Sequence, residues 1–139
     1  MYNRAMRISL TDTLRFNIAE IDTGHERIAM MLNEIGDSLN GKNMDNALRQ
    51  VIHLIAVERK HVIFENGLLE KHHYSDINNH TEYHGKLNAT LNKIMTALHN
   101  EDYDLADGLH NTLCTVFLDD ILRADLPFKS LLQHKILKT

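Results

Sequence analysis

Four long stretches of this sequence repeat apolar residues at alternating spacings of three and four positions. That spacing places the residues on one face of an α-helix, where they can pack against neighbouring helices. Proline occurs once and glycine six times in 139 residues, so few residues interrupt the pattern. The stretches run from Asp22 or Thr23 to Leu39, from about Asp45 to Leu69, from Ser75 or Asp76 to about His99, and from about Asp104 to Ala124 or Asp125. Because short loops join them, they predict an all-α, up-down-up-down four-helix bundle.

The length of 139 residues suits a single domain, and we expect residues 1–139 to form one, with its core over about 14–128. Residues before about 20 show no sustained period, which predicts an N-terminal arm laid across the helices. At the other end, Pro127 suits the first position of a short C-terminal helix that ends near Leu137.

Composition excludes several classes of function. The formal charge is −4 and no basic block occurs, so nucleic acid is not an expected partner. The apolar runs are too short to span a membrane, and the N-terminus does not resemble a secretory signal. Cys114 is the only cysteine, which excludes an internal disulfide and predicts a small core residue. We therefore expect a cytoplasmic protein, and a monomer.

Ligand-type residues interrupt the inward stripe of each predicted helix. Histidine and carboxylate side chains in a bundle core suit iron, or less often manganese or zinc. A histidine-rich surface can produce pairs four apart by chance, and a lone core histidine is more often hydrogen-bonded than a ligand. Four independent inward interruptions nevertheless favour a metal site. The candidate ligands are His25; His61 and Glu65; His80 and His84; and Asp120 and Asp125.

Other polar residues have simpler expected roles. Glu58 lies on the same stripe as His61, and we expect it to find a partner near the bundle end. Asp125 could also cap the short C-terminal helix. Five further histidines fall near helix ends or loops and are expected to face solvent: His72, His73, His99, His110 and His134.

The combined spacing resembles the hemerythrin family, and in particular the single-domain bacteriohemerythrins. The matching segments are residues 18–25, residues 61–65, Tyr74 followed by His80 and His84, and the region that ends at Asp125. The resemblance covers about residues 14–128. It implies a four-helix bundle that holds two non-haem iron ions, joined by an oxo or hydroxo bridge, and that binds dioxygen at one of them.

The resemblance also implies a role for each ligand. His25 and His61 would hold the iron that leaves a position open for dioxygen, and His80 and His84 would hold the other. Glu65 and Asp125 would bridge the two irons. The family has a histidine where this chain has Asp120, so Asp120 would be a changed ligand. Gly24 and Ser75 also replace the usual glutamine and proline.

Three classes of function remain open at this point. An oxygen-binding protein, for storage, delivery or sensing, is the first, and the sequence favours it over an enzyme. A di-iron enzyme that acts on peroxide, nitric oxide or dioxygen is the alternative, since an added carboxylate beside one iron would suit such chemistry. The two Glu-x-x-His matches, at Glu58 and Glu70, fall near a single helix and do not fit a ferritin-like oxidase. A sensor that acts through a separate protein partner, so far unknown, is the third.

Overall fold

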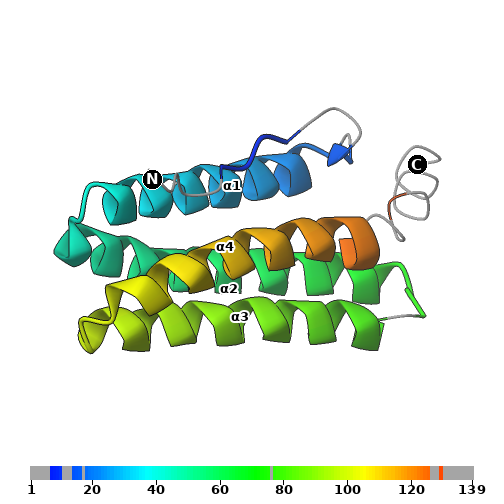
Figure 1. The fold of residues 1–139 in the computed structure, drawn as a ribbon. Coiled ribbons are helices and arrows are strands. Elements are labelled where there is room, and N and C mark those ends of the chain that lie inside the picture. Colours follow the sequence, from blue (N-terminus) through cyan, green and yellow to red (C-terminus); the bar gives the residue numbers. More distant parts are fainter. Residues whose placement is uncertain (1–6, 11–13, 17, 76, 126–128, 130–139) are drawn as a thin grey trace.

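The computed structural model describes residues 7–10, 14–16, 18–75, 77–125 and 129, with the backbone alone at 124 and 125. These residues form helices and contain no strand (Figure 1). The helices are α1 (Ala19–Asn40), α2 (Met44–Lys71), α3 (Ile77–His99), α4 (Tyr103–Asp119) and a terminal π-helix, η2 (Asp120–Asp125).

Each helix of the bundle runs opposite to the one before it, and short loops join them (Figure 1). Every helix packs against two of the others: α1 against α2 and α4, and α3 against α2 and α4. The predicted all-α four-helix bundle is therefore confirmed. Across the helices that the structure describes, no stretch combines the length and apolarity that a membrane crossing requires.

The direction of the chain brings four helix segments together at one end of the bundle. The first halves of α1 and α3 lie there beside the last halves of α2 and α4 (Figure 1). The predicted inward stripes of α1 and α3 are buried along nearly their whole length. The large side chains that are fully buried include Ile21, Ile28, Leu32, Ile35, Leu54, Leu69, Leu87, Leu91, Ile94 and Phe117.

Helix α1 begins earlier than predicted, because Asp22 does not cap it. Its N-cap is Ile18, which makes no side-chain capping bond. The Asp22 carboxylate instead reaches back and accepts a hydrogen bond from the backbone N–H of Phe16, at 2.7 Å. Asp22 is thus a buried anchor for the segment before the helix. By contrast, Asn43 and Asp102 cap α2 and α4 through their side chains, as their residue types favour.

The inward face of α4 differs from the prediction. The spacing of apolar residues in the sequence predicts Leu105, Leu109, Leu113 and Val116 on this face, but Leu105 is 50% exposed. The buried positions are Ala106, His110, Leu113, Cys114 and Phe117. Both sets repeat at three and four and share Leu113, so spacing alone could not choose between them. Cys114 is buried, as predicted for a core residue.

The prediction that His110 faces solvent was wrong. The side chain is fully buried, and its Nε2–H donates to the backbone carbonyl of Leu32, 2.8 Å away. A buried polar group needs such a partner, and α1 supplies one directly opposite α4. Burial lowers the pKa of His110, so the ring is neutral at pH 7. Burial also raises the pKa of the neighbouring Cys114 thiol to about 11.

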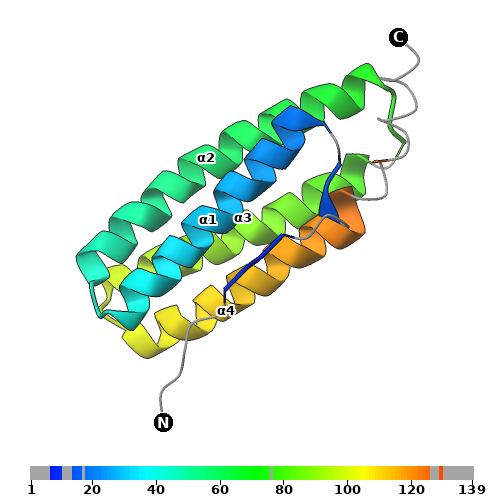
Figure 2. The ribbon, with the colours of Figure 1, turned by 90° about the horizontal axis from the view of Figure 1, so that it is seen from above.

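Part of the N-terminal arm lies along α1 (Figure 2). The side-chain amide of Asn33 accepts from the backbone N–H of Ile8 and donates to its carbonyl. Arg7 pairs with Asp37 one turn further along the helix. The described part of the arm therefore agrees with the prediction, while the predicted helix from Pro127 to Leu137 lies outside the described residues.

Candidate metal centre

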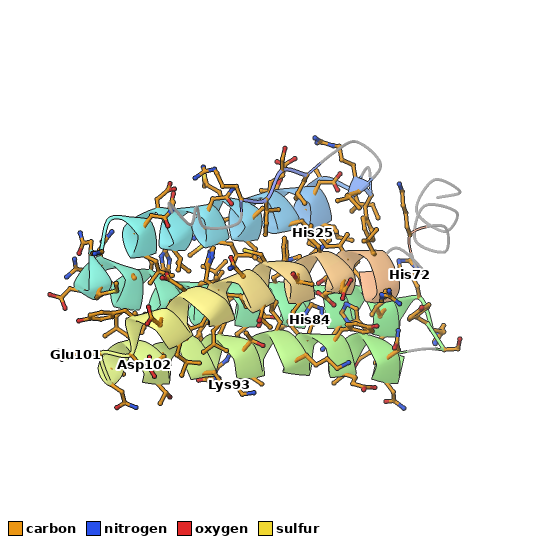
Figure 3. All side chains as sticks on the ribbon, viewed as in Figure 1. His25, His72, His84, Lys93, Glu101 and Asp102 are labelled. Atoms are coloured by element: carbon orange, nitrogen blue, oxygen red, sulfur yellow. The ribbon has the colours of Figure 1, made fainter. Side chains whose placement is uncertain are left out.

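Three helices supply five candidate ligands at one end of the bundle. His25 comes from α1, His61 and Glu65 from α2, and His80 and His84 from α3. Each pair on α2 and α3 is four residues apart, so both of its side chains leave the same face of the helix. All five are buried, and His25 and His84 are labelled on their two helices in Figure 3.

Glu65 lies at the centre of this cluster and has no exposed surface. The Nε2 atoms of four imidazoles surround its carboxylate, at 2.7 Å for His61, 3.3 Å for His84, 3.7 Å for His80 and 3.8 Å for His25. Neither Glu65 oxygen has a well-oriented hydrogen bond to any residue that the structure describes. A buried carboxylate is costly without a cation, so this arrangement calls for positive charge between the ligand atoms.

The two histidines of α3 also approach each other through their ligand atoms. The Nε2 atoms of His80 and His84 are 2.9 Å apart. Two nitrogens bound at about 2.1 Å and at right angles to one ion would be about 3 Å apart. The pair is thus spaced as two ligands of one ion, whereas without an ion a proton has to lie between them.

The ligand atoms form two groups that share one residue. One group is His25, His61 and Glu65, the other is Glu65, His80 and His84, and in each the ligand atoms lie within 4.8 Å of one another. Imidazole with carboxylate is a donor set that suits iron, manganese or zinc. The cluster could therefore hold a metal ion, with Glu65 placed between two positions for one.

The outer nitrogens of the α3 histidines are held by residues that the sequence reasoning missed or placed differently. Nδ1 of His84 donates to Oε1 of the buried Glu58, at 3.1 Å, and Nδ1 of His80 lies 3.3 Å from Oδ1 of Asn66. Such contacts orient ligand imidazoles and strengthen them as donors. The partner of Glu58 is therefore His84. The sequence feature that could have indicated this contact is the position of Glu58 on the same helix stripe as His61 and Glu65.

Opposite charges in the cluster hold Glu65 and His84 in their ionised forms. Burial alone would raise the pKa of Glu65, but the imidazoles of His61, His80 and His84 outweigh it and hold that pKa well below the usual range. Burial would lower the pKa of His84, but Glu58, Glu65 and Asp120 raise it to about 11. In the metal-free protein His84 is therefore an imidazolium at neutral pH.

Metal uptake should for this reason release a proton from His84. The ion must displace the proton on Nε2, because Nδ1 keeps its bond to Glu58. Below about pH 11, the apparent affinity should rise with pH, by about tenfold per unit for each proton released. Titrating the metal-free protein with zinc in weakly buffered dye solution measures this release. Uptake without any proton release would show that His84 is not a ligand.

Glu58→Gln should weaken metal binding by about 10–100-fold without abolishing it, because the loss of an outer partner has effects of that size. The amide keeps the shape of the side chain and removes its charge beside His84. Competition with a chelator of known affinity measures the change. Glu70→Gln, an exposed position on the same helix, removes the same charge and should leave the affinity unchanged.

Asp120 lies at the edge of this cluster, and not in either ligand group. It is buried, and its Oδ2 is 3.5 Å from Nδ1 of His84, the same nitrogen that contacts Glu58. It therefore adds negative charge on the outer side of that ring. Its role as a direct ligand stays a prediction.

Asp125 belongs to η2, but its side chain is outside the described part of the chain, so its role also stays a prediction. The π-helical backbone of η2 nevertheless affects where position 125 lies relative to position 120. In a regular α-helix, positions five apart lie on different faces. A π turn bonds residues five apart, which brings positions 120 and 125 towards the same face. Single π turns of this kind are frequent at functional sites.

Aromatic rings close the α1 side of the cluster. The ring of His25 lies in T-shaped contact with the rings of Phe16 and Phe117, at centroid distances of 5.5 Å and 6.2 Å. Both phenylalanines are buried. Sequence reasoning gave Phe16 no role at the site, because its place beside His25 depends on how the arm folds back to Asp22.

Fold and site together define a four-helix bundle with a buried histidine and carboxylate cluster that could hold a metal ion. No protein-family model matches this sequence, and a search of curated proteins finds no match.

Proposed function

We propose that the chain is a non-haem di-iron protein of the hemerythrin family that binds dioxygen. The observation that carries this proposal is the pair of ligand groups that share Glu65. One shared carboxylate between two groups of imidazoles is the donor arrangement that a pair of bridged metal ions requires. A single-ion site would not need histidines on both sides of it.

In this proposal each pair of histidines serves one ion. His25 and His61 would hold the first and His80 and His84 the second, while Glu65 and Asp125 would supply carboxylates to both. A bound iron pair would supply the redox chemistry that dioxygen binding requires. The chain itself orients the imidazoles of His80 and His84 from outside, through Asn66 and Glu58.

The surroundings of His25 favour binding over turnover. Phe16 and Phe117 lie in T-shaped contact with its ring, and the neighbouring α1 residues Ile21 and Ile28 are buried and apolar. Such apolar packing limits the access of water to His25. This supports reversible binding, since oxidation of the iron is promoted by access to water.

The experiment is metal analysis and absorption spectroscopy of the protein from iron-replete cells. Two irons per chain are expected, with a visible spectrum that changes on admission of air and reverses when oxygen is removed. Zinc alone, or no metal, would refute the proposal. Steady consumption of oxygen in the presence of a reductant would instead favour the di-iron enzyme.

Asp120→His should slow the oxidation of the ferrous protein in air. The aspartate lies 3.5 Å from His84, and its negative charge favours ferric over ferrous iron by electrostatics, whether or not it is a direct ligand. The neutral imidazole removes that charge. Stopped-flow or conventional spectroscopy gives the oxidation rate, and potentiometry should show a higher reduction potential. If both are unchanged, Asp120 does not influence the iron.

A further inference from the structure

A pocket between α1 and α2 lies over the outer side of His61. Its volume is about 430 Å³, and its wall combines the apolar Val57 and Phe64 with Arg27 and Lys60. Pockets of roughly 300–1,000 Å³ suit small organic molecules. This pocket is therefore large enough for a ligand of several heavy atoms, well beyond a single water or a simple inorganic ion.

Because Gly24 has no side chain, the His61 ring can lie against α1 in the wall of this pocket. A Cβ atom at position 24 would lie 2.4 Å from Nδ1 of His61 and 2.7 Å from its Cε1, so any other residue would displace the ring. The opposite nitrogen, Nε2, is 2.7 Å from Glu65. The imidazole thus has Nε2 towards the buried cluster and its Nδ1 edge beside Gly24, and both residues line the pocket.

The outer nitrogen of His61 differs from those of the α3 histidines. Nδ1 of His80 has Asn66 and Nδ1 of His84 has Glu58 as a partner. Within the part of the chain that the structure describes, no side chain or carbonyl is recorded as accepting a hydrogen bond from Nδ1 of His61. The imidazole of a metal ligand almost always donates from its other nitrogen. A molecule bound in the pocket is one source of such an acceptor.

The charges around the pocket favour a negatively charged group as the acceptor for Nδ1 of His61. Arg27 and Lys60 both line it, and neither forms an ion pair with a carboxylate among the described residues. Glu20 is the acidic side chain in the lining. The net charge of the residues that line the pocket is therefore positive, although the whole chain has a formal charge of −4. Phe64 is 39% exposed and offers an apolar surface beside these cations.

We propose that this pocket binds a small organic carboxylate. One carboxylate oxygen accepts from Nδ1–H of His61, the charge pairs with Arg27 and Lys60, and the apolar body packs on Val57 and Phe64. The inference rests on the proposed function in one respect: a metal at Nε2 of His61 fixes the ring proton on Nδ1. Through this hydrogen bond the ligand would increase the basicity of a metal-binding imidazole.

Benzoate is a suitable probe, and benzyl alcohol has nearly the same shape without the charge. Calorimetric titration of the iron-loaded protein should show saturable binding of benzoate and at least tenfold weaker binding of benzyl alcohol. In nitrogen-15 spectra of a zinc-loaded sample, the Nδ1 resonance of His61 should shift on addition of benzoate. Equal binding of both probes, or no saturable binding of benzoate, would overturn the proposal.

The double variant Arg27→Gln with Lys60→Gln tests the location. It should weaken benzoate binding about tenfold or more, because two exposed charges are removed. Lys93→Gln is the matched control, since Lys93 lies on α3, away from the pocket (Figure 3). A double variant that binds benzoate as well as the control does would place the ligand elsewhere and overturn the proposal.

Failure of this proposal can be distinguished from failure of the proposed function. If the chain takes up two irons but benzoate does not bind, the pocket proposal alone is wrong. If the chain takes up no metal and benzoate still binds in a way that depends on Arg27 and Lys60, the di-iron proposal alone is wrong.

Discussion

Glu65→Gln should abolish metal binding while the chain still folds. Glu65 is the one residue that belongs to both ligand groups, and its carboxylate lies within 4 Å of four imidazole nitrogens. An amide of the same shape carries no charge to offset a cation and is a poor bridging ligand. Metal content should fall from two ions per chain to nearly none, as measured by elemental analysis after purification with iron.

The same variant should also change the stability of the metal-free protein. Loss of one partner from a buried charged pair costs about 3–5 kcal/mol. Because the pKa of Glu65 is held well below its unfolded value of 4.5, its contribution is present above that pH and is lost as the pH falls through the folded pKa. Denaturant unfolding should therefore separate Glu65→Gln from the parent chain at pH 7, with the difference shrinking in acid. Glu70→Gln should match the parent at both pH values.

Removal of the metal should lower the melting temperature by roughly 10 °C, and adding metal back should restore it. A ligand present at about a thousand times its Kd stabilises the folded state by about 4 kcal/mol, and a domain of this size gains a few degrees for each kcal/mol. Without the ion, the buried Glu65 keeps only its contacts with histidines, one of which must remain charged.

Thermal unfolding followed by circular dichroism, before and after chelation, measures this shift. The Glu65→Gln variant serves as the control, because it should melt at the same temperature with and without metal. If the parent chain also melts at one temperature in both states while binding metal fully, the cluster is not where the metal binds.

Much of the bundle could be predicted from the spacing of apolar residues. The stripes of α1 and α3 were predicted almost completely, because long helices with a strict repeat leave one choice of inward face. The inward face of α4 was not predicted, since Leu105 and Ala106 each begin a repeat with steps of three and four residues. Only packing against α1, where His110 meets the carbonyl of Leu32, distinguishes them.

The candidate site likewise has a part that could be predicted from the sequence and a part that could not. The positions of His61, Glu65, His80 and His84 followed from pairs four apart on single helices. The contact of Glu58 with His84 joins two helices, and that of Phe16 with His25 joins the arm to α1. Contacts between elements depend on how the helices rotate against each other, which a single sequence does not reveal.

The placement of ligands on α2 and α3 has a consequence for the order of folding. These helices are consecutive, the loop between them is short, and together they supply four of the five described ligands and one complete ligand group, Glu65 with His80 and His84. Contacts between neighbouring segments close small loops and form quickly. If the cluster binds metal as proposed, the α2–α3 hairpin would be able to bind an ion while α1 and α4 are still unfolded, and His25 would join the site later. Free metal should in that case speed the refolding of a chain that also folds without it.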